Sequence, residues 1–174
     1  MRILRIVKNY LLYCGIEKTD YIKIKKDAYI SNYKVWRVLH FLMAGMFGVL
    51  YVVSFFSDLM KPNSVFYLIG FLYSVVAIAA FLFLRNDSII AQFLIYLSII
   101  VLYLFGCFIT AGRPGSPAVT FIVLLLITPM FMIDKPVFMT LVLCISSTVF
   151  LIWMHAVKPY EVWRIDAGNV IPFT

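Results

Sequence analysis

The sequence predicts an all-α protein, a polytopic bundle of membrane-spanning helices, and three observations carry that prediction. Of its 174 residues, 64% are hydrophobic and only 13% are charged, whereas a soluble domain is about 45–50% apolar and about 25% charged. The apolar residues are gathered in runs close to the ~20 residues that a helix needs to cross a bilayer. Nine of the fifteen basic residues lie within residues 1–37, directly before and at the start of the first such run.

The first element, residues 1–34, is a basic leader. Residues 2–14 segregate at helical spacing, with Ile3, Val7 and Leu11 on one face and arginine and lysine on the other. A basic amphipathic helix of this kind lies in the membrane interface and is attracted to anionic lipids. The following stretch, "TDYIKIKKDAYISNYK", fits either a second short helix or a strand, because "YIKIKK" alternates.

The transmembrane bundle is predicted over residues 35–154. Short polar connections such as "RNDS" and "DKP" separate its apolar runs, and short connections between long helices make them antiparallel neighbours. Five spans are expected, at about residues 35–56, 65–84, 89–110, 116–133 and 137–154.

The fourth of these runs is ambiguous, because Ala118–Ile133 is short and contains Pro129. It could be a span, a re-entrant hairpin or a buried strand of a soluble domain. A crossing keeps the flanking connections on alternating faces, and Thr128 together with neighbouring helices can satisfy the carbonyl that the proline frees. A kinked spanning helix is therefore the prediction.

Charge orients the bundle. With the N-terminus in the cytoplasm, eleven basic residues fall on the inner face and four on the outer face, as the positive-inside rule requires. The predicted location is the plasma membrane, with multiple spans. Residues 155–174 are then an outer tail, in which Asp166 or Asn169 caps the start of a truncated sixth helix.

No catalytic motif, cofactor-binding motif or metal-ligand cluster occurs in the sequence, which predicts a protein that is not an enzyme, with no cofactor and no metal site. The lone charge of the "GRPGSP" loop and the ionisable or amide side chains inside the spans are the candidate ligand contacts. They are Arg113, Ser116, Thr120, His40 and Gln92. Small residues four apart let helix backbones approach closely and predict packing between the first two spans. They are Ala44 with Gly48 and Gly70 with Ser74.

Three stretches, "KNYLLYCGIEKTDYIKIK", "SPAVTFIVLLLITPMFMIDKP" and "VKPYEVWRIDAGNVI", together resemble the N-terminal membrane region of GGDEF-type diguanylate cyclases of gut Firmicutes. The resemblance implies a short cytoplasmic leader, about six helices and a cyclase domain after the last one. This chain has no GGDEF signature. The resemblance therefore implies a sensory or anchoring module of cyclic-di-GMP signalling without its output domain, either a stand-alone protein or a truncated one.

The expected partners are the lipid bilayer, anionic lipids at the N-terminal helix, a second copy of the chain and a C-terminal output domain. Nucleic acid is not expected, because the basic residues have no base-reading motif around them. A different class stays open: the substrate-binding membrane subunit of a small-solute transporter, which is also built from five or six short-looped helices. Polar groups converging at mid-membrane, or interrupted helices in both halves, would favour that class.

Overall fold

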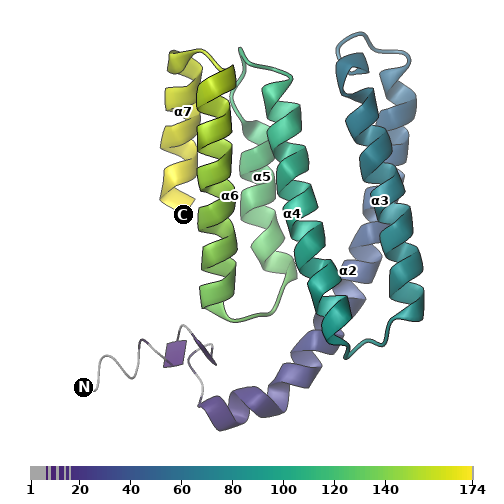
Figure 1. Ribbon diagram of the computed structural model, residues 1–174, viewed down its shortest axis with the longest axis vertical. Helices are drawn as coiled ribbons and strands as arrows, with labels where there is room; N and C mark the ends of the chain where they lie inside the picture. The colour runs from purple at the N-terminus through teal and green to yellow at the C-terminus, as the bar shows by residue number, and fades with distance from the viewer. Residues whose placement is uncertain (1–6, 8, 11, 14, 16, 174) are drawn as a thin grey trace.

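The computed structural model describes residues 7, 9, 10, 12, 13, 15 and 17–173, and the described residues contain helices and no strand. The helices run antiparallel, joined by short connections at the two ends of the bundle (Figure 1). In the view of Figure 1 the α2–α3, α4–α5 and α6–α7 connections form the upper end, and the α3–α4 and α5–α6 connections form the lower end. The elements are α2 (Lys18–Ser54), η1 (Lys61–Asn63), α3 (Ser64–Phe83), α4 (Ile89–Ala111), α5 (Val119–Ile127), η2 (Thr128–Phe131), α6 (Pro136–Val157), α7 (Tyr160–Val170) and η3 (Ile171–Phe173).

Four helices are long and apolar enough to cross a membrane: α2, the η1–α3 unit, α4 and α6. The predicted all-α membrane fold is confirmed at that level. The predicted spans 65–84, 89–110 and 137–154 correspond to α3, α4 and α6 with ends shifted by three residues or fewer. These helices were predictable because polar or turn-forming residues interrupt the apolar runs at both ends.

Helix α2 is one continuous element of 37 residues, so its length is about 55 Å at 1.5 Å per residue. The strand alternative for residues 19–34 is therefore wrong, and no boundary separates a leader from a first span at residue 35. The N-terminal part of α2 passes below the α5–α6 connection, where the Lys135 ammonium lies 5.5 Å from the centre of the Tyr21 ring. The predicted helix over residues 2–14 lies mostly outside the described residues.

The fourth run does not form one kinked helix of spanning length. Its α-helical part, α5, has nine residues, and η2 adds one 3₁₀ turn of four residues. Together they rise about 20 Å, short of the ~30 Å hydrocarbon core. The Thr128 hydroxyl donates to the Leu124 carbonyl at 2.7 Å, whereas the carbonyl that lacks its donor because of Pro129 is that of Leu125.

The sixth helix begins earlier than predicted. Helix α7 starts at Tyr160, directly after Pro159, whose fixed φ favours a helix start. Asp166 therefore lies inside the helix, and neither Asp166 nor Asn169 caps it. Helix α7 runs back from the upper end beside α6 (Figure 1), so the sixth helix comprises residues 160–170 and not only a first turn after Asn169.

Helices α2 and α3 pack closely through small residues. A Cβ at Gly70 would lie 3.0 Å from three ring atoms of Phe47, and one at Gly48 would lie 3.4 Å from the Phe71 ring. Ser74 is buried, with its hydroxyl bonded to the Gly70 carbonyl at 2.8 Å, and Ala44 is half-buried. The ring of one helix thus rests on the glycine of the other, which is the close approach that small residues allow.

Candidate functional site

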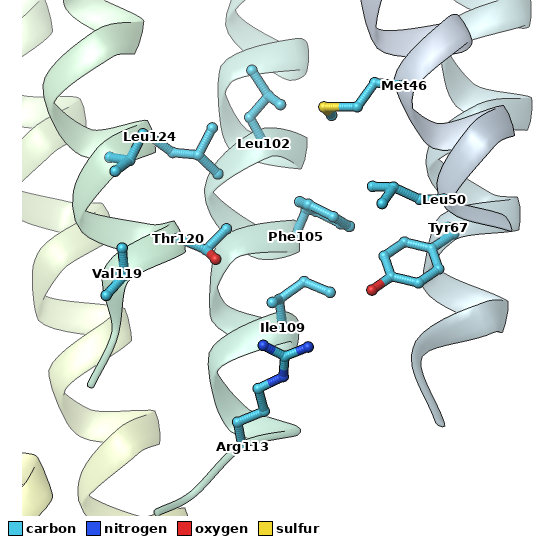
Figure 2. A pocket seen from close by; sticks show the side chains of 11 residues that line it. Met46, Leu50, Tyr67, Leu102, Phe105, Ile109, Arg113, Val119, Thr120 and Leu124 are labelled. Atoms are coloured by element: carbon cyan, nitrogen blue, oxygen red, sulfur yellow. The ribbon is translucent and has the colours of Figure 1, made fainter. Parts of the chain in front are cut away.

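An apolar groove lies between the α2–α3 hairpin and the α4–α5 pair. It has a volume of about 400 Å³, within the ~300–1,000 Å³ range of small-molecule sites. Figure 2 shows side chains from α2, α3, α4 and α5 converging on this space, with the Arg113 guanidinium at one end. We call it the Arg113 groove. Its lining residues are Met46, Leu50, Tyr67, Leu102, Phe105, Ile109, Arg113, Val119, Thr120, Val123 and Leu124.

Three of these lining residues carry polar groups: Arg113, Tyr67 and Thr120. Arg113 follows the last turn of α4, and its guanidinium points back along the helix toward Ile109 (Figure 2). The described part of the chain gives none of the three side chains a hydrogen-bond or ion-pair partner. A cation and two hydroxyls are thus available to a ligand in an otherwise apolar space.

The predicted ligand residues divide into two groups. Arg113 and Thr120 line the groove, and they also line a second cavity of about 200 Å³ that continues to Ser116. The structure therefore brings together the three candidates that belong to the α4–α5 connection and its neighbouring turn. His40 and Gln92 lie elsewhere.

His40 is fully buried in a polar cluster that joins three helices. Its Nδ1 lies 2.6 Å from the Trp36 carbonyl and its Nε2 lies 2.9 Å from the Ser98 hydroxyl. The Tyr73 hydroxyl is 2.8 Å from the same serine oxygen. Because a carbonyl only accepts, Nδ1 carries a hydrogen, and the Ser98 hydroxyl beside Nε2 itself donates to the Leu94 carbonyl at 2.7 Å. Both ring nitrogens are thus occupied, which explains a buried histidine without a ligand.

Gln92 lies nearer the lower end. Its amide nitrogen donates to the Tyr29 carbonyl at 3.1 Å, and its buried Oε1 has no partner in the described structure. The bond ties α4 to the part of α2 that precedes the first predicted span. Gln92 therefore contacts the basic segment of α2 and not the Arg113 groove.

Sequence reasoning missed the polar contacts that hold the two ends of α5. At the lower end Asn32 of α2 bonds both backbone groups of Ile133: its amide donates to the carbonyl at 2.9 Å and its Oδ1 accepts from the N–H at 2.8 Å. Asn32 is 1% exposed. We call this contact the lower clamp.

At the upper end Lys158 and Asp166 form an ion pair at 2.6 Å, and both side chains are 0% exposed. The Lys158 ammonium also donates to the Ser116 carbonyl at 2.7 Å, and Asp166 Oδ1 accepts from the Ala118 N–H at 2.8 Å. This upper clamp fastens the "GRPGSP" loop to the α6–α7 junction. The sequence does show Lys158 and Asp166 on either side of Pro159 and the start of an amphipathic stretch. Their role in binding the loop is visible only once α7 is placed beside that loop.

The four membrane-length helices, together with a short helix whose irregular ends are held inside protein, define a polytopic helical membrane protein. Non-helical backbone at membrane depth is tolerated where protein buries it. No protein-family model, curated protein or solved structure matches the chain.

Proposed function

We propose that the chain is a membrane-embedded sensory or anchoring module of a bacterial signalling protein of the cyclic-di-GMP type, without catalytic activity of its own. In this proposal it lies in the plasma membrane with the lower end cytoplasmic, and α5 with η2 completes a fifth, short crossing. The observation that carries the proposal is the Arg113 groove, because its polar groups have no partner among the described residues and it lies between the α2–α3 hairpin and the α4–α5 pair.

Two hydrophobic clusters lie on the two sides of the groove. Met43, Phe47 and Tyr67 form the smaller one in the α2–α3 hairpin, and the larger one is built mainly from α4, α5 and α6 and also includes Trp36 of α2 and Phe81 of α3. A ligand between them shifts the balance between two packings only as far as it binds one of them better. The groove is therefore suited to converting occupancy into a change of hairpin position.

Helix α2 supplies the connection to the cytoplasmic side. Met46 and Leu50 line the groove, and the helix continues without interruption from there to Lys18. That is about 40 Å of helix at 1.5 Å per residue. A displacement of the hairpin would move the basic segment at the lower end, where an output partner can sense it.

A transporter subunit is the second candidate, favoured by the short α5 and the buried His40–Ser98–Tyr73 cluster. Discontinuous helices and polar groups at mid-depth are typical of transporters. In this chain, however, Asp166 accepts from the N–H of Ala118, directly before α5, and Asn32 bonds Ile133, which follows η2, so the backbone on both sides of the α5–η2 unit is bonded within the protein. That arrangement favours the sensory module.

The sensing proposal is tested by joining the chain to a diguanylate cyclase domain through an extension of α7 that reaches the lower face. We expect cyclic-di-GMP output to respond to medium composition in the parent fusion and in Arg164→Ala, a matched change at an exposed arginine. Arg113→Ala should lose the response, because the guanidinium is the only charge lining the groove. Output that is constant in all three fusions would reduce the chain to a passive anchor.

The orientation is tested by single cysteines placed in a cysteine-free background. Lys26→Cys lies in the exposed basic part of α2, and Asp58→Cys lies in the α2–α3 connection at the opposite end. An impermeant maleimide added to intact cells should label Asp58→Cys and leave Lys26→Cys unlabelled until the cells are broken. Labelling of Lys26→Cys from outside contradicts the proposed orientation.

A further inference from the structure

We propose that the Arg113 groove binds a free long-chain carboxylate, with the acid group on Arg113 and the hydrocarbon chain along α4. This inference rests on the proposed function in one respect, that occupancy of the groove is the signal. The binding itself stands on the geometry of the groove.

The residues that line the groove indicate the shape of the apolar part of the ligand. Eight of the eleven lining residues are aliphatic, methionine or phenylalanine, and three of them, Leu102, Phe105 and Ile109, follow α4 toward Arg113 (Figure 2). From Leu102 to the end of α4 at Ala111 the helix rises about 14 Å at 1.5 Å per residue, and Arg113 follows two residues later. An unbranched chain lying parallel to α4 matches this long apolar space, whereas a compact polar solute would leave it unfilled.

The polar groups fix the head of the ligand. A guanidinium binds a carboxylate through two parallel hydrogen bonds, and Arg113 has no such partner among the described residues. Thr120 lies beside Arg113 in both cavities of this region, so its hydroxyl can donate to one of the remaining lone pairs. A ligand with one negative charge is neutralised by the single cation of the site.

In a bilayer, the acid group determines whether the ligand prefers the groove to the surrounding lipid. Lipid tails are as apolar as the groove lining, so an apolar chain gains little by leaving lipid for the groove. The difference in affinity must come from Arg113, which stabilises an acid group and offers nothing comparable to a neutral ester. The position of Arg113 near the connection of α4 and α5 also gives the acid group access from the membrane surface.

Charge alone does not distinguish a free fatty acid from an anionic diacyl lipid, and the position of the charge relative to the chain favours the fatty acid. Thr120 and Val119 close one side at Arg113 and Tyr67 closes the other (Figure 2). A planar carboxylate at the end of one chain places its charge in line with that chain, beside Arg113. A phosphodiester carries its charge on a glycerol unit between two chains, so one of the two chains would not share the position beside α4.

The test measures binding of radiolabelled palmitate to the full chain in nanodiscs of neutral lipid. We expect saturable binding in the parent protein and about 10- to 100-fold weaker binding in Arg113→Gln, which is the range for loss of a hydrogen bond to a charged group. Arg164→Gln is the matched control and should bind as the parent does. Val123→Trp, which fills the groove from an exposed lining position, should abolish binding, and Val76→Trp on the exposed face of α3 should not. Circular dichroism checks that each variant keeps its helix content.

Competing ligands show which class of molecule supplies the negative charge that binds Arg113. Unlabelled palmitate should displace the label, while methyl palmitate, acetate and phosphatidylglycerol should not. Displacement by methyl palmitate equal to that by palmitate overturns the role of Arg113. Displacement by phosphatidylglycerol alone assigns the groove to bilayer lipid and overturns the proposal, as does binding that Val123→Trp leaves intact.

The cyclase fusion tests the proposed sensory function separately from ligand binding. Palmitate binding without any change in cyclic-di-GMP overturns the sensory function and leaves the binding site in place. An Arg113-dependent output without palmitate binding overturns the ligand assignment and leaves the sensory function in place.

Discussion

Asp166→Ala is expected to lower the free energy of unfolding by about 3–5 kcal/mol, the cost of leaving one partner of a buried ion pair without the other. The Lys158 ammonium would remain buried with only the Ser116 carbonyl as partner, and the Ala118 N–H would lose its acceptor. The measurement is reversible unfolding in mixed micelles with increasing SDS, followed by circular dichroism. Lys158→Met should have an effect of the same order, because it leaves the carboxylate uncompensated.

A double-mutant cycle separates the pair from the rest of the helix. Lys158→Met combined with Asp166→Ala removes both charges, so the double variant should be more stable than the sum of the single losses predicts, by about 0.5–3 kcal/mol. The matched control is Glu161→Ala with Arg164→Ala, an ion pair on the same helix whose side chains are 76% and 68% exposed. Exposed pairs contribute about 0–1 kcal/mol. An Asp166→Ala loss no larger than that of Glu161→Ala would show that the upper clamp does not hold the bundle.

Asn32→Leu is expected to have the second large effect, because it removes the partner of both backbone groups of Ile133, whose bonds to Asn32 are part-buried. Each such group costs about 1–3 kcal/mol when its partner is removed. Because Asn32 makes its contact at the lower end of the bundle, its loss should accelerate hydrogen exchange of the Ile133 amide more than that of amides in the middle of α4. Mass spectrometry of the exchanged peptides gives both quantities.

Asn86→Leu is the control for that experiment, since Asn86 is an exposed asparagine in the α3–α4 connection. It should change neither stability nor exchange at Ile133. If Asn32→Leu leaves the Ile133 amide as protected as in the parent protein, the lower clamp contributes nothing and the end of η2 must be held by other contacts.

The sequence predicted the long helices well and the short one poorly, for a physical reason. Apolar runs bounded by turn residues report where a helix can lie in lipid, and α3, α4 and α6 follow that pattern. The predicted border at residue 35 followed a change in composition, but no proline and no helix-ending glycine lies between Lys18 and Val35, so the helix continues. In the fourth run the length of α5 depends on side chains that meet it from α2 and α7, which no local pattern reports.

The candidate site was predictable in its residues and not in its shape. Arg113 was singled out as the lone charge of its loop, and Thr120 lies seven residues further along, at the start of α5, so their proximity follows from the chain. The groove itself arises from the spacing between the α2–α3 hairpin and α4–α5. Tyr67 reaches it from α3, and its role could not be read from one helix alone.

The placement of the two clamps imposes an order on the assembly of the protein during synthesis. The partner for the lower end of the α5–η2 unit is Asn32, which the ribosome makes long before α5, whereas the partner for the upper end is Asp166, which it makes after α6. Until α7 emerges, the Ala118 N–H has no acceptor in the chain and must stay near water, because lipid offers none. The lower end of the α5–η2 unit can therefore form its contact with Asn32 first. The "GRPGSP" loop becomes bonded to the bundle only when α7 docks.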